Sequence, residues 1–327
     1  MSIIAAITSI ADLANIGGGL VITSNIYENV AEGIETSSSF QHLLPSKAAD
    51  FWIGCYLRKS GNANNNGFLT LFDTAYSATQ GLFAIAQTGS NTGIYRVNYW
   101  NGSAWTAASA ETFTIDSGVL YRIDFHVKIA NAGGVIELYL NGALTMTGAI
   151  DDTRITDTVT GINKVEFGNF ASSLNRCQWS AMLFADEDTR AMFMAQRLPT
   201  GNGANTAWTG AFGDVDEQGI TDSDYITSTT AGAKETFTHA ALPAAWATGF
   251  SVEAVAVSYR VSAGQNSGVV TKDLQRIGGT DYVGTSLGNN AQITPVQKVY
   301  NQSPATSADW TMSEAASEFG VIVEAAA

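Results

Sequence analysis

The chain has 327 residues, of which 45% are hydrophobic and only 14% are charged, against roughly 25% charged in an average soluble domain. With 16 Lys and Arg against 30 Asp and Glu, the formal net charge is −14. No stretch gathers enough basic residues to neutralise a phosphate backbone, so we do not expect the chain to bind nucleic acid or an anionic membrane surface. The length allows two domains, and no apolar run reaches the eighteen or so residues that a membrane-spanning helix needs, so membrane insertion is not expected.

The N-terminal stretch MSIIAAITSIADLANIGGG spaces Ile3, Ile4, Ile7 and Ile10 as a short helix would. No basic residue precedes this apolar run, so it fits a secretory signal poorly, and we expect a soluble protein that is not exported by the usual route. We predict that residues 1–19 form an attachment segment whose four isoleucines dock on a neighbouring subunit. The alternative is a helix that packs on its own domain.

From residue 51 onward the pattern predicts β-structure. YRIDFHVKI, residues 121–129, alternates strictly, with apolar side chains on one face and His126 among the polar side chains of the solvated face. Further strands are predicted at 51–58, 68–73, 81–87, 93–108, 164–170 and 177–186. Short strands separated by Gly and Asn turns favour a sandwich or jelly roll over an α/β fold.

GGVIELYLNGALTM, residues 133–146, predicts a hairpin around Asn141-Gly142. A two-residue loop would mix apolar and polar side chains on both faces. A three-residue loop, 140–142, would instead set Leu138 opposite Leu144 and Ile136 opposite Met146, so we predict the longer loop.

A helix is predicted at 187–196, with Asp186, Glu187 and Asp188 as its cap and first-turn residues. The Gly-, Asn- and Thr-rich tract that follows marks a domain boundary, which gives domains at 20–196 and 197–327. Beyond it, strands are predicted at 234–240, 250–261, 268–274, 281–285, 296–300 and 319–325. The predicted fold class is therefore all-β, an N-terminal jelly-roll sandwich followed by a second, smaller β-sandwich.

No pattern of catalytic residues stands out. Glycoside hydrolysis needs two facing carboxyl groups, and the chain has no Glu-x-Asp-x-Glu run on a strand; a Gly-x-Ser-x-Gly elbow is also absent. No cofactor or metal motif is present, although Asp151, Asp152 and Asp157 leave calcium open. Cys55 and Cys177 lie in apolar strands and are expected as buried free thiols, with a disulfide between them as the alternative. We expect a protein without enzymatic activity.

Aromatic residues are the better candidates for a site. Tyr99, Trp100 and Trp105 flank the Asn101-Gly102 turn, where an exposed indole could stack on a sugar ring or hold a partner protein. The alternative is a cross-strand aromatic pair that stabilises the hairpin.

Two parts of the chain resemble known families. YRIDFHVKIANAGGVIELYLNGAL, with GINKVEFGNF and CQWSAMLFAD, resembles the laminin-G or concanavalin A-like jelly roll over roughly residues 20–190. TDYITSTTAGAKETFTHAALP, RIGGTDYVGT and SPATSADWTMSEAASEFGVIVEA are similar to the C-terminal portion of tailed-bacteriophage structural proteins. The second resemblance implies a virion component that is assembled in the host cytoplasm.

We therefore predict a virion structural protein, a tail appendage or capsid decoration, that binds other virion proteins and forms a homo-oligomer. The alternative is a carbohydrate-binding adhesin that contributes host attachment through a surface glycan. A polysaccharide-degrading enzyme is the third hypothesis, disfavoured by the missing carboxylate run.

Overall fold

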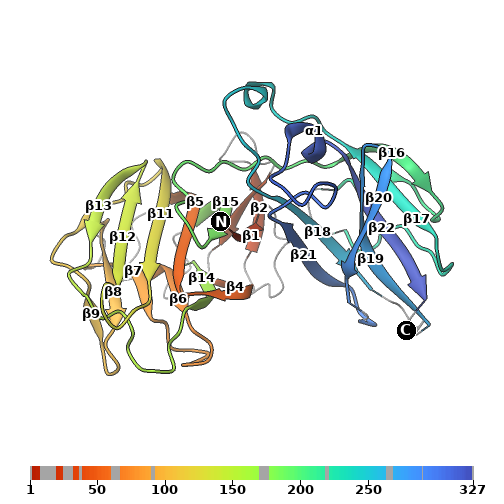
Figure 1. The fold of residues 1–327 in the computed structure, drawn as a ribbon. Coiled ribbons are helices and arrows are strands. Elements are labelled where there is room, and N and C mark those ends of the chain that lie inside the picture. Colours follow the sequence, from red (N-terminus) through yellow and green to blue (C-terminus); the bar gives the residue numbers. More distant parts are fainter. Residues whose placement is uncertain are drawn as a thin grey trace. The chain divides into compact units, whose positions relative to one another are not determined.

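The protein is described from a computed structural model in which the chain forms two compact units, Met1–Met194 and Ala195–Ala327. The structure describes residues 2–7, 20–24, 32–36, 39–59, 67–89, 93–168, 177–217, 221–262, 268–288 and 290–325. These residues are almost entirely strands and turns, which confirms the predicted all-β class (Figure 1). Each unit is described by itself below.

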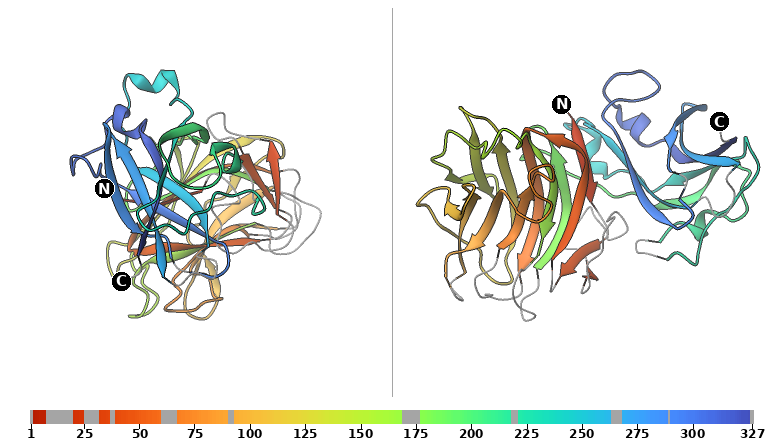
Figure 2. Two further views of the ribbon diagram at one scale, coloured as in Figure 1. Left: turned by 90° about the vertical axis from the view of Figure 1, so that its right-hand side faces the viewer. Right: turned by 90° about the horizontal axis from the view of Figure 1, so that it is seen from below.

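The N-terminal unit is a sandwich of two antiparallel sheets (Figures 1 and 2). Among the described residues, the eight-stranded sheet has the order β13-β12-β11-β5-β15-β3-β2, and β1 also pairs with β15. Its strands are β1 (Ile3–Ile7), β2 (Leu20–Ser24), β3 (Glu32–Thr36), β5 (Asp50–Lys59), β11 (Leu120–Lys128), β12 (Val135–Leu140), β13 (Ala143–Thr147) and β15 (Cys177–Ala185).

The seven-stranded sheet, counted over the same described residues, has the order β10-β8-β7-β6-β14-β4, with β9 paired to β8. Its strands are β4 (Phe40–Ala48), β6 (Gly67–Phe72), β7 (Phe83–Gln87), β8 (Ile94–Trp100), β9 (Trp105–Ala107), β10 (Phe113–Thr114) and β14 (Ile162–Phe167). Strand side chains alternate between faces, so each sheet has one face in the core and one outer face.

Aromatic side chains hold the two sheets together. The ring of Phe167 in the seven-stranded sheet lies 5.0 Å from that of Trp179 and 6.2 Å from that of Phe184, both on β15 of the other sheet. All three are fully buried. The packing gives edge-to-face pairs, the geometry that aromatic rings favour in cores.

The N-terminal segment is a strand where the spacing predicted a helix. β1 pairs with β15, and Ile3, Ile4 and Ile7 are all buried. The helix prediction is wrong because the paired edge of β15 satisfies the backbone and the sandwich core covers the isoleucines. Ile10 lies outside the described residues. Whether these isoleucines attach the chain to a neighbour stays a prediction.

The hairpin between β12 and β13 has a two-residue turn, so the predicted three-residue loop is wrong. Leu140 pairs with Ala143, and Asn141 and Gly142 adopt φ angles of 52° and 80°, as a type I′ turn requires. The irregularity lies inside the ladder, where pairing shifts so that Leu138 faces Met146. A bulge in the strand, and not at the loop, therefore keeps the apolar stripe on the core side.

Residues 187–196 are not helical, which overturns the second predicted helix. Asp188 does not cap a helix but binds Arg190 through two carboxylate oxygens, with 2.9 Å from each to Nε. Arg190 in turn lies over the rings of Tyr139 and Trp52 on the outer face of the eight-stranded sheet. Contacts of the side chains with this sheet outweigh the local helical preference.

The C-terminal unit pairs a five-stranded sheet, β16-β17-β22-β19-β20, with the two-stranded ribbon β18-β21, both counted over the described residues. Phe319 and Ile277 of the larger sheet form a core cluster against Val255 and Val257 of the ribbon, so this unit is the smaller β-sandwich expected. Its elements are β16 (Pro199–Thr206), η2 (Phe212–Asp214), β17 (Lys234–His239), η3 (Ala244–Ala247), β18 (Val255–Val261), β19 (Val269–Ile277), β20 (Thr280–Ser286), β21 (Thr294–Tyr300), α1 (Met312–Ala315) and β22 (Glu318–Ala325).

Candidate functional site

Alternation along β8 divides the predicted aromatic residues between two faces. Val97 is buried and Tyr99 packs against the core, so Asn98 and Trp100 project from the outer face of the seven-stranded sheet. Trp105 on β9 pairs with Trp100 and shares that face. The structure therefore brings Trp100 and Trp105 together and separates Tyr99 from them.

The two tryptophans form a cross-strand pair. Their ring centroids lie 5.9 Å apart with the planes at 72°, and Nε1 of Trp100 donates to the hydroxyl of Tyr76 at 3.2 Å. Between them, Oδ1 of Asn101 accepts hydrogen bonds from two backbone amides of the turn. The pair stabilises the hairpin, as the alternative interpretation predicted, yet Trp105 remains 41% exposed. A binding role for these residues stays a prediction.

The register of six strands places a row of side chains across this outer face. Each of the six strands contributes one residue, and each of these residues is the register partner of the one on the neighbouring strand. We call this set the outer row. Its members are Gln41, Glu166, Thr70, Ala84, Asn98 and Ala107. With strands spaced about 4.8 Å apart, the row spans roughly 24 Å, the length of an extended ligand and not of a single small molecule.

Small residues next to the tryptophans shape this part of the face. A Cβ at Gly81 would lie 2.2 Å from Cγ2 of Thr70 and 3.3 Å from the ring of Trp105, so any larger residue there would displace the Thr70 methyl and press on the indole. Asn98 stands between Ala84 and Ala107 in the outer row. Its Oδ1 is buried and has no hydrogen-bond partner among the described residues. Buried polar atoms normally have partners, so this amide oxygen has unused accepting capacity.

The other end of the outer row carries charge. Nε2 of Gln41 donates to Glu166 at 2.7 Å. Beside them, the ammonium of Lys164 lies 3.8 Å from the ring centroid of Phe72 and also donates to the carbonyl of Ala78. Burial lowers the pKa of Lys164, against the attraction of Glu166. The face thus combines an exposed indole with amide, carboxylate and ammonium groups.

A second polar cluster lies on the outer face of the eight-stranded sheet. His126 stacks on Trp52 with the ring centroids 4.0 Å apart, and its two ring nitrogens contact Asp50 at 2.7 Å and Glu137 at 3.1 Å. The hydroxyl of Tyr139 donates to the same Glu137. The alternation of residues 121–129 predicted a solvated position for His126, whereas its side chain is buried. Because these groups bind one another, the cluster offers little free hydrogen-bonding capacity.

The described residues include both cysteines and the carboxylates that the sequence left open as calcium ligands. Within them, no group of three or more His, Cys, Asp or Glu side chains is arranged to hold a metal ion. Cys55 and Cys177 are free and buried, as predicted. Burial raises the pKa of Cys177 to about 12 and raises that of Cys55 as well, so neither is a reactive thiolate at neutral pH. No helix in the described ranges is long and apolar enough to cross a membrane.

Comparison with known proteins finds likeness in fold only. No family model and no curated protein matches the chain. Among solved structures, the globular domain of calreticulin from T. cruzi is 9% identical over 57% of this chain and 90% of its own, with a TM-score of 0.42. An alginate lyase in complex with an alginate trisaccharide is 10% identical over 52% of this chain and 80% of its own, with a TM-score of 0.35.

A third structure with a similar fold is a carbohydrate esterase from the Shiga toxin-encoding bacteriophage phi24B, 12% identical over 52% of this chain and 88% of its own, with a TM-score of 0.36. We expected a protein without enzymatic activity. Excluding an enzyme was wrong, because an alginate lyase and a carbohydrate esterase are among the similar structures. Likeness this distant assigns neither an activity nor a ligand to the chain.

Proposed function

We propose that the N-terminal unit binds carbohydrate on the outer face of its seven-stranded sheet. The observation that carries the proposal is the position of Trp105, which is 41% exposed in the same hairpin as the exposed amide side chain of Asn101. An aromatic ring stacks on the apolar face of a sugar, and a nearby amide takes part in hydrogen bonds with its hydroxyls.

Gln41 and Ala107, at the two ends of the outer row, are half-buried, whereas Glu166, Thr70, Ala84 and Asn98 between them are buried, so a glycan would find its exposed contacts at Trp105 and at the ends of the row. Gln41 on β4 lies at the opposite end of the row from Ala107 and Trp105 on β9, so these exposed contacts are far enough apart to suit an extended glycan. Small residues in between, Thr70 and Ala84, do not obstruct the row with bulky side chains. Specificity in such a site comes from a few placed polar groups beside apolar contact area.

The test is binding of the purified chain to a panel of polysaccharides, neutral glucans and galactans and acidic alginate, measured by affinity electrophoresis and calorimetry. Trp105→Ala is expected to weaken binding at least about tenfold, equivalent to ~1.4 kcal/mol. Leu144→Ala is the matched control, because Leu144 is 55% exposed on β13 in the other sheet. Binding that is equal in both variants, or absent for every polysaccharide in the panel, would overturn the proposal.

The finer form of the proposal sets this module on a virus particle. We infer that the chain is a virion component, a tail appendage or capsid decoration made in the host cytoplasm, that contacts other virion proteins as a homo-oligomer while its N-terminal unit engages host glycan. Support comes from the resemblance of its C-terminal stretches to tailed-phage structural proteins and from a surface poor in Lys, which suits contact with other protein.

Mass spectrometry and imaging of purified particles test the particle location. The chain is expected at a fixed copy number on the head or the tail, in density that antibodies to the C-terminal unit label. If particles lack the chain while the host cytoplasm contains it, the virion proposal is wrong. That result would not affect the carbohydrate proposal, which the polysaccharide binding experiment tests separately.

A further inference from the structure

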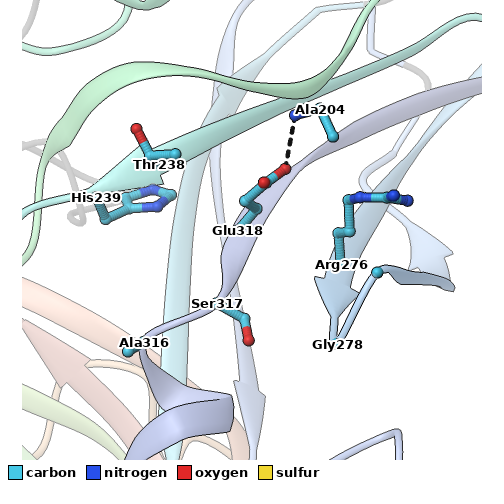
Figure 3. Close-up of a pocket in the computed structure, with 9 residues that line it drawn as sticks. Ala204, Thr238, His239, Arg276, Gly278, Ala316, Ser317 and Glu318 are labelled. Atoms are coloured by element: carbon cyan, nitrogen blue, oxygen red, sulfur yellow. Dashed lines mark hydrogen bonds between the residues drawn. The ribbon is translucent and has the colours of Figure 1, made fainter.

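The C-terminal unit has a cavity of about 500 Å³ at one end of its five-stranded sheet (Figure 3). This volume lies within the range of small-molecule sites. Side chains and turns from four strands line it: Ala204 on β16, Thr238 and His239 on β17, Arg276 on β19 with the following Gly278-Gly279 turn, and Glu318 on β22. In Figure 3, Glu318 lies between His239 and Thr238 on one side and Arg276 on the other.

The carboxylate of Glu318 is held in place by one of its oxygens. Oε2 accepts hydrogen bonds from the amide of Ala204 and from Oγ1 of Thr236, each at 2.8 Å. The close approach of β16 requires glycine, since a Cβ at Gly203 would lie 2.4 Å from this oxygen. No described residue donates to Oε1, which leaves one oxygen of an oriented carboxylate to accept from a ligand.

Arg276 supplies N–H donors to the cavity, and the positive charge of its guanidinium is balanced by an ion pair with Asp281. It stands directly opposite Glu318 in the sheet register, and its Nη1 binds Oδ1 of Asp281 at 2.5 Å. Asp281 also binds Lys234 at 2.7 Å. A guanidinium has five N–H donors, so pairing with Asp281 leaves others for a ligand.

His239 lies on the opposite wall of the cavity. Burial lowers the pKa of its imidazole to about 4, and the charge of Arg197 has a smaller effect in the same direction. This imidazole is therefore neutral at neutral pH.

The cavity therefore presents a carboxylate acceptor, guanidinium donors and a neutral imidazole, without a strong excess of either charge. A negatively charged ligand would lose hydration without gaining an unpaired counter-charge, because Arg276 and Lys234 already pair with Asp281. A polyol offers donors and acceptors on adjacent carbons, which match this set. We propose that the cavity binds one residue of a neutral sugar, whose hydroxyls donate to Oε1 of Glu318 and accept from the guanidinium of Arg276. This site lies in the other unit and is independent of the outer row.

The test is an NMR titration of the ¹⁵N-labelled full chain with glucose, galactose and mannose, compared with glucuronate and glucosamine as charged probes. At least one neutral sugar should cause saturable shifts at the amides of Ala204, Gly278 and Gly279. The same shifts should persist in Trp105→Ala, which separates this site from the one on the N-terminal unit. No saturable shift with any neutral sugar, or shifts with a charged probe alone, would overturn the proposal.

Two variants localise the binding. Gly278→Asn places a side chain in open space at the cavity rim. Gly278 has a φ of +58° in the two-residue turn between Ile277 and Thr280. Asn-Gly is favoured in such a turn, so we expect the variant to fold normally. Glu318→Gln keeps the shape and removes the charge of the acceptor. Each is expected to weaken sugar binding about tenfold: Gly278→Asn because the added side chain obstructs the rim, and Glu318→Gln because a charge-assisted hydrogen bond becomes a weaker neutral one. Gly133→Asn, at φ +69° in open space in the N-terminal unit, is the matched control. Equal affinity in all three variants would show that the sugar binds elsewhere.

Discussion

Oγ1 of Thr189 donates a 2.7 Å hydrogen bond to Oδ1 of Asp124, a carboxylate that is fully buried on β11. The guanidinium of Arg122 joins the two, since Nη2 lies 2.8 Å from Oδ1 of Asp124 and 2.8 Å from the carbonyl of Thr189. Gly54 on the neighbouring strand leaves the space for all three, because a Cβ there would meet each of them. The segment after β15 is thereby fastened to the eight-stranded sheet.

Replacing Thr189 by Val should destabilise the N-terminal unit by about 1–3 kcal/mol, because it leaves a buried carboxylate with one partner fewer. Urea unfolding followed by tryptophan fluorescence measures the change. Thr147→Val is the control, since Thr147 is exposed on β13, and its effect should stay within about 0.5 kcal/mol. Equal stability of the two variants would mean that Arg122 alone satisfies Asp124.

The strands that could be predicted were those with apolar alternation or a continuous apolar run. β11 and β5 were of this kind, and both lie at the centre of the eight-stranded sheet. β16 was missed because PTGNGANT has the composition of a linker. Its glycines serve packing: Gly203 lets the strand approach Glu318, a contact more than a hundred positions away that no local pattern reveals.

The candidate site was predictable only in part. Trp100 and Trp105 flank a recognisable turn, so their proximity followed from local sequence. The position of Asn98 in a row with Glu166 depends on the pairing of β6, β7, β8 and β14, which local sequence does not specify. His126 was misplaced for the same reason, because its partners Asp50 and Glu137 come from two neighbouring strands.

Ile7→Ala should destabilise the N-terminal unit by about 2–5 kcal/mol, the usual cost of truncating a buried aliphatic side chain to alanine. Ile7 is fully buried in the core cluster. Thermal unfolding measures the change, with Ile94→Ala as the control at a position that is 37% exposed. Unchanged stability together with loss from particles would instead favour the attachment role predicted for this segment.

Cys55 and Cys177 should remain unreactive toward a thiol reagent at pH 8 in the folded protein and react with two equivalents in denaturant. Both are buried, and burial raises the pKa of each, so the thiolate that such reagents attack is scarce. A colorimetric disulfide-exchange assay with and without urea measures this. Rapid reaction of either cysteine in the folded chain would contradict the burial seen in the structure.

Asp273→Asn should stabilise the C-terminal unit at pH 7 by about 1–3 kcal/mol, because Asn is neutral in this buried position, whereas Asp must either ionise there or hold a proton that the unfolded chain has lost. Asp273 is fully buried on β19, and neither carboxylate oxygen has a hydrogen-bond partner among the described residues. Burial raises the pKa of this carboxyl and outweighs the opposite effect of the Lys298 ammonium. The folded state therefore holds the proton more tightly than the unfolded chain. The parent protein loses stability as pH rises from about 4, the ordinary pKa of Asp, through the raised pKa of the folded state.

Urea midpoints of parent and variant at pH 3.5 and pH 7 measure the difference in stability, which should grow with pH because Asn does not ionise. A difference that is the same at both pH values would mean that folding does not raise the pKa of Asp273.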